Sequence, residues 1–374
     1  MSTRKAVKQK QENELPLPRI SHKKFLQIDR NYERAASVAD LVYVSDSKPG
    51  ISRQKKGRGY VYMYQDKPVR KKEDIERIRA IVIPPAWTSV WICPIANGHL
   101  QATGIDLRKR KQYRYHVLWS VLRNETKFHR LYEFGKELPA LRDRLETDLA
   151  DRELTDKKVI ATVIALLERT CIRVGNGEYE KLYGSQGLTT MKDKHVEING
   201  STVIFSFTGK KGKTHNITLK NKRLSRIVQH CRDIPGKELF QYIDNEGKRR
   251  PIDSGMINNY IKEVTNKDFT SKDFRTWAGT LHLLLSLKSI GEAVTKTETK
   301  QNIVKALDEV SLKLGNTRTV CRKYYVHPGL IELYEKNNLQ QYFKKLDKAE
   351  NKPGKNELTP EEEVLMEILH SFHT

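Results

Sequence analysis

The fold is decided by residues 195–219, which read HVEINGSTVIFSFTGKKGKTHNITL. An Asn199-Gly200 turn and a Gly-Lys turn after Thr208 divide this stretch into three short runs that contain Val, Ile, Phe and Thr. Residues of these types favour strands, and an Asn-Gly pair between two such runs is typical of a hairpin. We therefore predict a three-stranded meander, with strands at 195–198, 202–208 and 214–219.

On both sides of this meander, apolar residues recur at helical spacing. The clearest pattern starts at Asp156 as an N-cap and continues with Val159, Ile160, Val163, Ile164, Leu166 and Leu167. Helical patterns begin near Leu118, and after the meander we expect helices at 221–231, 255–264, 275–289, 300–314 and 329–346. These patterns predict a mainly helical domain over residues 119–348 with a β insert.

Upstream of the helical domain the sequence is typical of strands. Three runs that start at Leu41, Gly59 and Ser89 are bounded by Gly, Pro, Asn or Asp, and residues 71–83 between the last two have helical spacing. We expect a small β-sheet domain over residues 39–118, preceded by a basic tail with a short helix at 24–39. The predicted fold class is therefore α+β.

Residues 349–374 are expected to form a linker and a short terminal helix. Thr359 can act as N-cap, Pro360 occupies the first helical position, and Glu362 completes a capping box. The helix has an apolar stripe made of Val364, Leu365, Ile368 and Leu369. We expect this stripe to dock on the body of the protein, although docking on a partner is the alternative.

The charge of the chain points to a polyanionic partner. Lysine and arginine number 69 against 46 acidic residues, which gives a formal net charge of +23 at pH 7. The excess is spread along the chain, as in proteins that bind nucleic acid. A basic protein that adheres to nucleic acid or anionic lipid without a specific role would have the same composition, so charge narrows the partner and leaves the chemistry open.

Several classes of protein are disfavoured by the sequence. No apolar run approaches the roughly 20 residues that a membrane helix needs, and the N-terminus has no apolar segment typical of a secretory signal, so we expect a cytosolic or nuclear protein without a membrane partner. The four cysteines are far apart and the histidines lack ligand spacing, so we predict no metal site. The sequence contains no P-loop, which is consistent with chemistry that needs no ATP, and we expect no small-molecule cofactor.

Five short segments could contribute to one catalytic site. They are Ile172-Arg173-Val-Gly175-Asn, Thr208-Gly-Lys210-Lys-Gly-Lys, Lys272-Asp-Phe-Arg275-Thr-Trp, Gly315-Asn316-Thr317, and the tyrosine pair that ends at Tyr325. Each has an ordinary explanation when taken alone, because an arginine often caps a helix and a lysine-rich turn is often an exposed hairpin tip. Their combination and their order carry the signal.

Together these residues meet the needs of metal-free phosphodiester transesterification. Charge builds up on the nonbridging phosphate oxygens, and the guanidinium groups of Arg173 and Arg275 can stabilise it because they are always charged and grip two oxygens at once. Lys210 on a hairpin can protonate the leaving 5′-oxygen if neighbouring cations depress its pKa. Tyr325 follows Arg322 and Lys323, whose charges favour the phenolate that a nucleophile requires.

Residues 41–346 resemble the type IB topoisomerases of the compact bacterial and poxvirus kind, whose catalytic domain is like that of eukaryotic topoisomerase I. That family has an arginine in Ile-Arg-x-Gly, a lysine in Gly-Lys on a β-hairpin, an arginine in Lys-Asp-x-Arg-Thr, and a late tyrosine. The resemblance places these roles on Arg173, Lys210, Arg275 and Tyr325. It implies a monomeric C-shaped clamp around double-stranded DNA, a 3′-phosphotyrosyl intermediate, strand rotation and religation.

Two details of the resemblance concern the nucleophile and its surroundings. In the bacterial branch the tyrosine directly before Val-His-Pro is the nucleophile, which favours Tyr325 over Tyr324. The family commonly has a histidine nine residues before the nucleophile, whereas this chain has Asn316. The asparagine amide can donate a hydrogen bond but carries no charge, so we expect weaker and largely pH-independent stabilisation at that position.

DNA contacts are expected at Lys272 and, in a stretch rich in cations and tyrosine, at Gln112, Tyr113 and Arg114. A solvated basic strand is the alternative for the last three residues. Two other functions remain open. A tyrosine recombinase shares the chemistry but typically has His-x-x-Arg where this chain has Lys272-x-x-Arg275. A non-catalytic architectural DNA-binding protein would need only basicity and a clamp.

Overall fold

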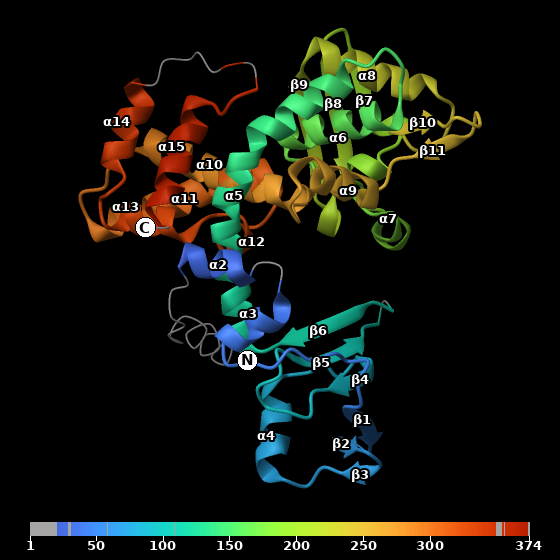
Figure 1. Ribbon diagram of the computed structural model, residues 1–374, viewed down its shortest axis with the longest axis vertical. Helices are drawn as coiled ribbons and strands as arrows, with labels where there is room; N and C mark the ends of the chain where they lie inside the picture. The colour runs from blue at the N-terminus through green and yellow to red at the C-terminus, as the bar shows by residue number, and fades with distance from the viewer. Residues whose placement is uncertain are drawn as a thin grey trace. The chain divides into compact units, whose positions relative to one another are not determined.

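The computed structural model of the protein describes residues 21–28, 31–57, 59–107, 109–348, 354 and 356–372. The chain divides into two compact units, the first extending to His129 and the second covering Arg130–Phe372 (Figure 1). The fold combines α-helices with antiparallel strands, as the sequence predicts. None of the helices in the described part of the chain combines the length and the apolar character that a membrane crossing requires.

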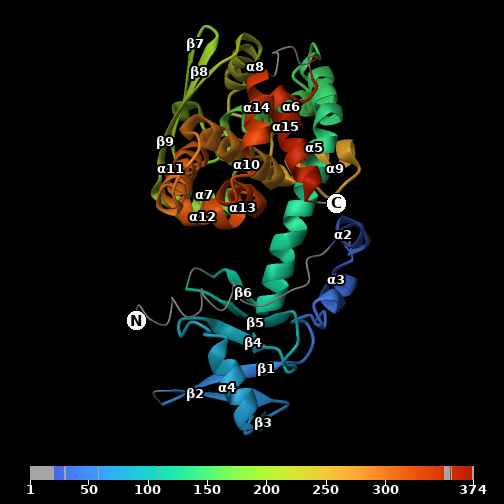
Figure 2. The same cartoon turned by 90° about the vertical axis from the view of Figure 1, so that its left-hand side faces the viewer.

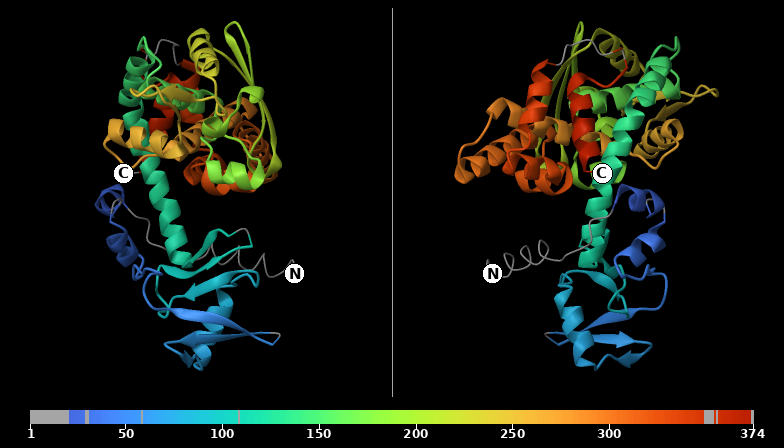
Figure 3. Two further views of the ribbon diagram at one scale, coloured as in Figure 1. Left: turned by 90° about the vertical axis from the view of Figure 1, so that its right-hand side faces the viewer. Right: turned by 60° about the vertical axis from the view of Figure 1, so that its left-hand side comes forward.

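The first unit is built on a six-stranded antiparallel sheet with the strand order β3-β2-β1-β4-β5-β6. Its strands are β1 (Ile51–Lys56), β2 (Gly59–Tyr64), β3 (Lys67–Pro68), β4 (Thr88–Ile92), β5 (Leu100–Ile105) and β6 (Lys111–Tyr115). Helix α4 (Lys72–Ala80) packs on one face through Ile78, which shares a small core with Ile51 and Ile92 (Figure 3). Helices α2 (His22–Ile28) and α3 (Tyr32–Val38) form a second small core with the first turns of α5 (Val117–Leu149).

The first unit differs from the sequence prediction in several places. The predicted strand at Leu41 is only an isolated bridge between Val42 and Gly98, and the single helix predicted at 24–39 is two helices. Strand β1 was not predicted because its sequence, ISRQKK, is dominated by polar and charged residues. It forms because its backbone pairs with both β2 and β4, which outweighs its low strand propensity. The basic tail with its short helix was predicted over residues 1–38, and residues 1–20 of it lie outside the described residues.

The second unit is mainly helical. It contains the rest of α5, which has Pro139 in its interior, and the helices α6 (Asp156–Thr170), α7 (Gly177–Tyr183), α8 (Lys222–Asp233), α9 (Ser254–Thr265), α10 (Ser271–Ile290), α11 (Lys296–Leu314), α12 (Arg318–Tyr324), α13 (Pro328–Glu335), α14 (Gln340–Lys348) and α15 (Pro360–Ser371). Helix α6 is buried along most of its length because apolar residues lie on almost every side, and it contacts α8, α9 and α10. It is the central helix of the unit.

The predicted meander is confirmed within one residue at each boundary. Strands β7 (Val196–Asn199), β8 (Thr202–Thr208) and β9 (Thr214–Lys220) form an antiparallel sheet along one side of the second unit (Figure 2). The tip between β8 and β9 is a short 3₁₀ turn, η3 (Lys210–Gly212). A separate hairpin of β10 (Gln241–Ile243) and β11 (Arg249–Pro251) was not predicted.

Helix boundaries in the second unit correct several sequence predictions. The N-cap of α6 is Thr155, whose hydroxyl accepts a hydrogen bond from the Lys158 amide at 3.3 Å, and Asp156 is the first helical residue. The helix predicted at 329–346 is two helices, α13 and α14, separated at Asn337, which has a left-handed backbone with φ of 59°. The short helices α7 and α12 were not predicted, because seven residues are too few to establish a helical period.

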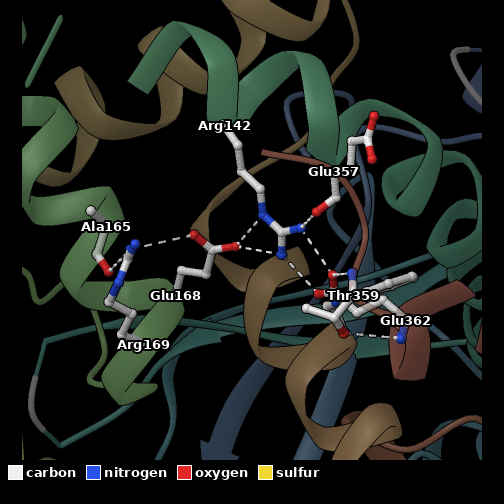
Figure 4. Close-up of polar contacts among 8 residues, drawn as sticks. Arg142, Ala165, Glu168, Arg169, Glu357, Thr359 and Glu362 are labelled. Atoms are coloured by element: carbon white, nitrogen blue, oxygen red, sulfur yellow. Dashed lines mark hydrogen bonds and ion pairs between the residues drawn. The ribbon is translucent and has the colours of Figure 1, made fainter. Parts of the chain in front are cut away.

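The C-terminal helix α15 docks on the second unit, as predicted. Thr359 and Glu362 form the expected capping box, and Val364, Leu365, Ile368 and Leu369 are buried in the main core. Arg142 of α5 donates to both carboxylate oxygens of Glu362, at 2.9 and 2.8 Å, and to Glu168 of α6 at 2.8 Å (Figure 4). Burial alone would raise the pKa of Glu362, but the hydrogen bonds and charge of Arg142 lower it below its usual value.

Candidate active site

The ends of two helices define the floor of the candidate site. Helix α6 ends at Cys171, which has a left-handed backbone with φ of 56°, and α11 ends at Gly315 with φ of 60°. Such C-caps stop the helix and leave its last carbonyl groups without helical partners. The residues that follow these caps are Ile172-Arg173 and Asn316, so two of the predicted site residues enter the site directly after a helix terminus.

Arg275 joins the two helix ends. It lies on the second turn of α10 and is only 4% exposed. Its Nη1 donates to the carbonyl oxygen of Cys171, and its Nη2 donates to that of Leu314 at 2.7 Å. A cation is favourable there because carbonyl groups at a helix C-terminus carry partial negative charge. The arrangement fixes the guanidinium group, and its Nε has no hydrogen-bond partner among the described residues.

Tyr325 lies beside this fixed charge. The Cζ atom of Arg275 is 5.2 Å from the centroid of the Tyr325 ring, within the range of a cation–π contact. The Tyr325 amide donates to the Cys321 carbonyl at 2.9 Å, so the residue continues the last turn of α12. Its own carbonyl accepts from the Thr280 hydroxyl at 3.4 Å. Gly279 permits this approach, because a Cβ at that position would lie 2.5 Å from the Tyr325 carbonyl oxygen.

The neighbouring Tyr324 has a different environment. Tyr324 is 40% exposed, whereas Tyr325 packs against the main core and is followed by the fully buried Val326. Adjacent residues at the end of a helix point in different directions, so only one tyrosine of the pair can face the arginines. The structure brings Tyr325 to them.

Arg173 forms the opposite wall of the site. Its Nη2 donates to Asn316 Oδ1 and lies 3.5 Å from the Gly315 carbonyl oxygen. Burial and the positive charge of Arg275 lower the pKa of Arg173 to about 10, although Tyr325, with which it shares a hydrogen bond, acts in the opposite direction. A group with a pKa of about 10 is still almost fully protonated at pH 7. Two guanidinium cations therefore lie next to one tyrosine.

Asn316 has one donor left. The backbone N–H of Asn316 donates to the carbonyl oxygen of Ser311 at 3.0 Å, and the side-chain Oδ1 accepts a hydrogen bond from Arg173. The side-chain Nδ2 is buried and has no hydrogen-bond partner among the described residues. An unsatisfied buried donor is costly unless something binds it, and such groups are typical of ligand sites. This nitrogen can accommodate an oxygen acceptor close to Arg173.

The β8–β9 hairpin borders the same region. Lys210 is exposed in the turn η3 at its tip. Lys213, three residues further along, has its Nζ 3.5 Å from the Asn316 carbonyl oxygen. The hairpin therefore places Lys213 at the edge of the wall formed by Arg173 and Asn316, with Lys210 three residues before it in the chain.

His215 is part of this wall and was not singled out from the sequence. Its ring stacks on Phe207, with centroids 5.0 Å apart, and fills the space left by Gly315, where a Cβ would lie 2.2 Å from the imidazole. Burial and the charges of Arg173, Lys213 and Arg275 lower the pKa of His215, which favours the neutral ring. The sequence around His215 does not indicate that it lines the site, because its contact with Gly315 joins β9 to the end of α11.

The predicted DNA-contact residues are divided between the two units. Lys272 is exposed on the first turn of α10. In β6, Gln112 donates to Asp106 at 3.0 Å and Arg114 donates to the Val82 carbonyl at 3.2 Å. Tyr113 on the other face of the strand is 47% exposed and stacks on Tyr115. Of these three β6 residues, Tyr113 therefore presents the largest open surface.

Comparison with known proteins gives a consistent result. Residues 109–352 match the family model described as "Eukaryotic DNA topoisomerase I, catalytic core", and residues 59–106 match "Bacterial DNA topoisomerase IB, N-terminal domain". The chain is 33% identical to a DNA topoisomerase 1B of Acanthamoeba polyphaga mimivirus over 296 residues, which is 77% of this chain and 88% of the relative. It is 22% identical to the DNA topoisomerase 1B of vaccinia virus (strain Copenhagen) over 63% of this chain and 72% of the relative.

Proposed function

Because this chain belongs to the type IB DNA topoisomerases, we propose that Tyr325 is its nucleophile and that Arg173, Lys210, Arg275 and Asn316 complete the catalytic site. The protein is thus a DNA-cleaving and religating isomerase that needs no ATP. The observation that carries the assignment is the position of the Tyr325 ring, which lies 5.2 Å from the Arg275 guanidinium carbon and is hydrogen-bonded to Arg173. Two fixed cations beside the tyrosine can stabilise the negative charge that develops in the transition state of phosphoryl transfer.

The proposed reaction exchanges one phosphodiester for another. The Tyr325 hydroxyl releases its proton to water as its oxygen attacks a backbone phosphorus of duplex DNA, the bond from phosphorus to the 5′-oxygen breaks, and a 3′-phosphotyrosyl link forms. The departing 5′-oxygen takes a proton from Lys210 and becomes a hydroxyl group. The free end rotates about the intact strand, and the reverse reaction then restores the DNA with relaxed supercoiling. Because the energy of the broken ester is kept in the covalent link, no external energy source is needed.

The charged and polar groups would stabilise the transition state from fixed positions. Arg173 supplies a guanidinium group already oriented by Asn316, and Asn316 Nδ2 is a buried donor without a partner among the described residues. Both Nη atoms of Arg275 donate to backbone carbonyl oxygens. A nonbridging phosphate oxygen could therefore interact only with its Nε–H and with its positive charge. Preorganised donors of this kind account for large parts of enzymatic rate enhancement because they need no rearrangement during the reaction.

We also propose how the protein holds its substrate. A monomer would enclose duplex DNA, with the sheet domain at 39–118 on one face and the helical domain at 119–348 on the other. Lys272, Gln112, Tyr113 and Arg114 remain the proposed DNA contacts, with the exposed Lys272 and Tyr113 best placed. Such an enzyme acts where the DNA is, and we propose a cytoplasmic, nucleoid-associated protein, or a nuclear one if the source is eukaryotic.

Trapping the covalent intermediate tests the proposed function. The substrate is a duplex whose cleaved strand continues for only a few nucleotides beyond the cleavage site. After cleavage this short 5′-hydroxyl fragment dissociates, so religation is no longer possible and the covalent complex accumulates. We expect a denaturation-resistant protein–DNA complex, and mass spectrometry of its peptides should locate the nucleotide on Tyr325. An adduct on Tyr324 would overturn the choice of nucleophile, and an adduct through a 5′-phosphate would overturn the assigned polarity.

The alternatives raised by the sequence receive no support from these matches, because the two family models and the relatives named above are all topoisomerases. A recombinase would require synapsis of two specific DNA sites, and an architectural protein would form no covalent complex. The trapping experiment therefore also distinguishes the proposed function from an architectural DNA-binding protein.

Replacing Asn316 with histidine should preserve relaxation. A neutral imidazole can accept from Arg173 through one ring nitrogen and donate through the other, so it keeps both functions of the amide. We expect initial rates of plasmid relaxation within about tenfold of the parent, the range of one net hydrogen bond. Asn316→Ala is the matched control, and loss of the donor should slow relaxation by about 10² to 10³. Inactivity of the histidine variant with a parental melting temperature would contradict the proposed donor role.

A further inference from the structure

The C-terminal helix α15 and Phe372, the residue directly after it, contact the helix that carries Arg275 and the segment that follows Tyr325. The first contact is with α10. Trp277, two residues after Arg275, is buried, and its Nε1 donates to Glu362 Oε1 of α15 at 3.0 Å. Gly135 of α5 makes room for this junction, because a Cβ there would lie 2.4 Å from Met366 and 2.6 Å from the Trp277 ring. The indole is therefore fixed between α15 and α5, directly next to the turn that bears Arg275.

The second contact is with the segment that follows Tyr325. Phe372, directly after α15, stacks on the ring of His327 with centroids 4.8 Å apart and an interplanar angle of 17°. His327 is 7% exposed, and its Nδ1 accepts from the Gly329 amide at 3.0 Å at the start of α13. Gly329 leaves a slot for Phe372, since a Cβ there would lie 2.4 Å from the phenyl ring. Phe372 thus fixes a residue two positions from Tyr325.

Helix α15 is itself anchored to the central part of the second unit. Arg142 holds Glu362 with two hydrogen bonds and also binds Glu168 of α6 and the Glu357 carbonyl before the helix (Figure 4). Glu362 is 4% exposed, so this carboxylate cannot leave Arg142 without losing buried hydrogen bonds. The same carboxylate receives the Trp277 indole. The Arg142–Glu362 pair therefore connects α5, α6, α10 and α15.

We propose that α15, together with its C-cap Phe372, positions Arg275 and Tyr325 relative to each other, and that Trp277 of α10, Glu362 of α15 and Phe372 are the positioning residues. This inference rests on the proposed roles of Arg275 and Tyr325. Helix α15 lies beyond residues 109–352, the part of the chain that matches the catalytic-core family model. A displacement of about 1 Å between reacting groups can lower a rate about 10²-fold, so these contacts influence cleavage without touching DNA.

The test compares variants of Phe372 in the full-length protein. Phe372→Leu keeps an apolar side chain but loses the stack on His327, and Phe372→Tyr keeps the ring. The measurements are the single-turnover rate of covalent complex formation at saturating trapping duplex, the dissociation constant for the same duplex, and the melting temperature. We expect Phe372→Leu to lower the cleavage rate about 10- to 100-fold at an unchanged dissociation constant. Phe372→Tyr should restore the rate.

A second pair of variants guards against a general loss of stability. Glu362→Gln removes the charge that Arg142 requires, whereas Glu367→Gln, on the same helix, breaks an exposed ion pair with Lys345 of α14. Both variants are assayed at a temperature at which they remain folded, and only Glu362→Gln should slow cleavage. A parental cleavage rate in both Phe372→Leu and Glu362→Gln would overturn the inference, as would a rate that falls only as far as the folded fraction.

The Tyr325→Phe variant, assayed in parallel, separates the two proposals. If Tyr325→Phe still forms a covalent complex, the proposed function fails, whatever the α15 variants do. If Tyr325→Phe is inactive while the α15 variants cleave at the parental rate, the proposed nucleophile stands and the positioning role of α15 fails.

Discussion

Replacing Tyr325 with phenylalanine is expected to abolish relaxation of supercoiled plasmid DNA completely. The substitution removes only the hydroxyl oxygen that would form the phosphotyrosyl bond, so no covalent intermediate can arise. The ring remains, and with it the contact to Arg275 and the packing against the core, so the variant should fold normally. Relaxation is measured by gel electrophoresis of plasmid topoisomers over a wide range of enzyme concentrations.

Tyr324→Phe is the matched control for this substitution. Tyr324 is adjacent in sequence but 40% exposed, and we expect its variant to relax plasmid at the parental rate. Duplex binding by Tyr325→Phe should also match the parent, which shows that the loss is chemical. Undiminished relaxation by Tyr325→Phe would exclude this residue as the nucleophile, and a defect confined to Tyr324→Phe would transfer the role to its neighbour.

The substitution of Lys210 by alanine should have the second-largest effect. If Lys210 protonates the leaving 5′-oxygen, its removal forces an alkoxide to depart, and general acid catalysis of this kind contributes about 10² to 10⁴ in rate. Lys210 is exposed at the hairpin tip, so its truncation should leave the melting temperature unchanged. The measurement is the single-turnover cleavage rate on a trapping duplex.

A sulfur atom in place of the leaving oxygen makes this prediction specific. A thiolate is a much better leaving group than an alkoxide and needs no proton, so Lys210→Ala should cleave the sulfur-substituted duplex at nearly the parental rate. Lys213→Ala provides a control, since Lys213 belongs to the same hairpin but contacts the Asn316 carbonyl. If sulfur fails to rescue Lys210→Ala, the lysine acts through charge or binding and not as the general acid.

Local patterns in the sequence were sufficient for much of the fold. The strands of the β7–β9 meander and the capping box of α15 were predicted almost to the residue, because turn pairs such as Asn199-Gly200 and capping residues such as Thr359 and Glu362 act on their immediate neighbours. The mistaken helix at 329–346 shows the limit of such patterns. Its break at Asn337 depends on a left-handed backbone that the apolar spacing does not reveal.

The candidate site could be predicted as a set of residues but not as an arrangement. Arg173, Arg275, Asn316 and Tyr325 were selected by chemistry and resemblance, and the structure brings them together. The attachment of Arg275 to the carbonyls of Cys171 and Leu314 could not be predicted, because it depends on how the ends of α6 and α11 meet. The same holds for His215, whose partners are distant in sequence.

The contact between Gly315 and His215 constrains how this site can change during evolution. Gly315 is restricted by its positive φ and also by the imidazole that fills the space beside it. A residue with a side chain could become established at position 315 only after position 215 had acquired a smaller residue, and the reverse order would produce an inactive intermediate. Among related sequences, we therefore expect these two positions to vary together, and a large residue at 215 to be accompanied by glycine at 315.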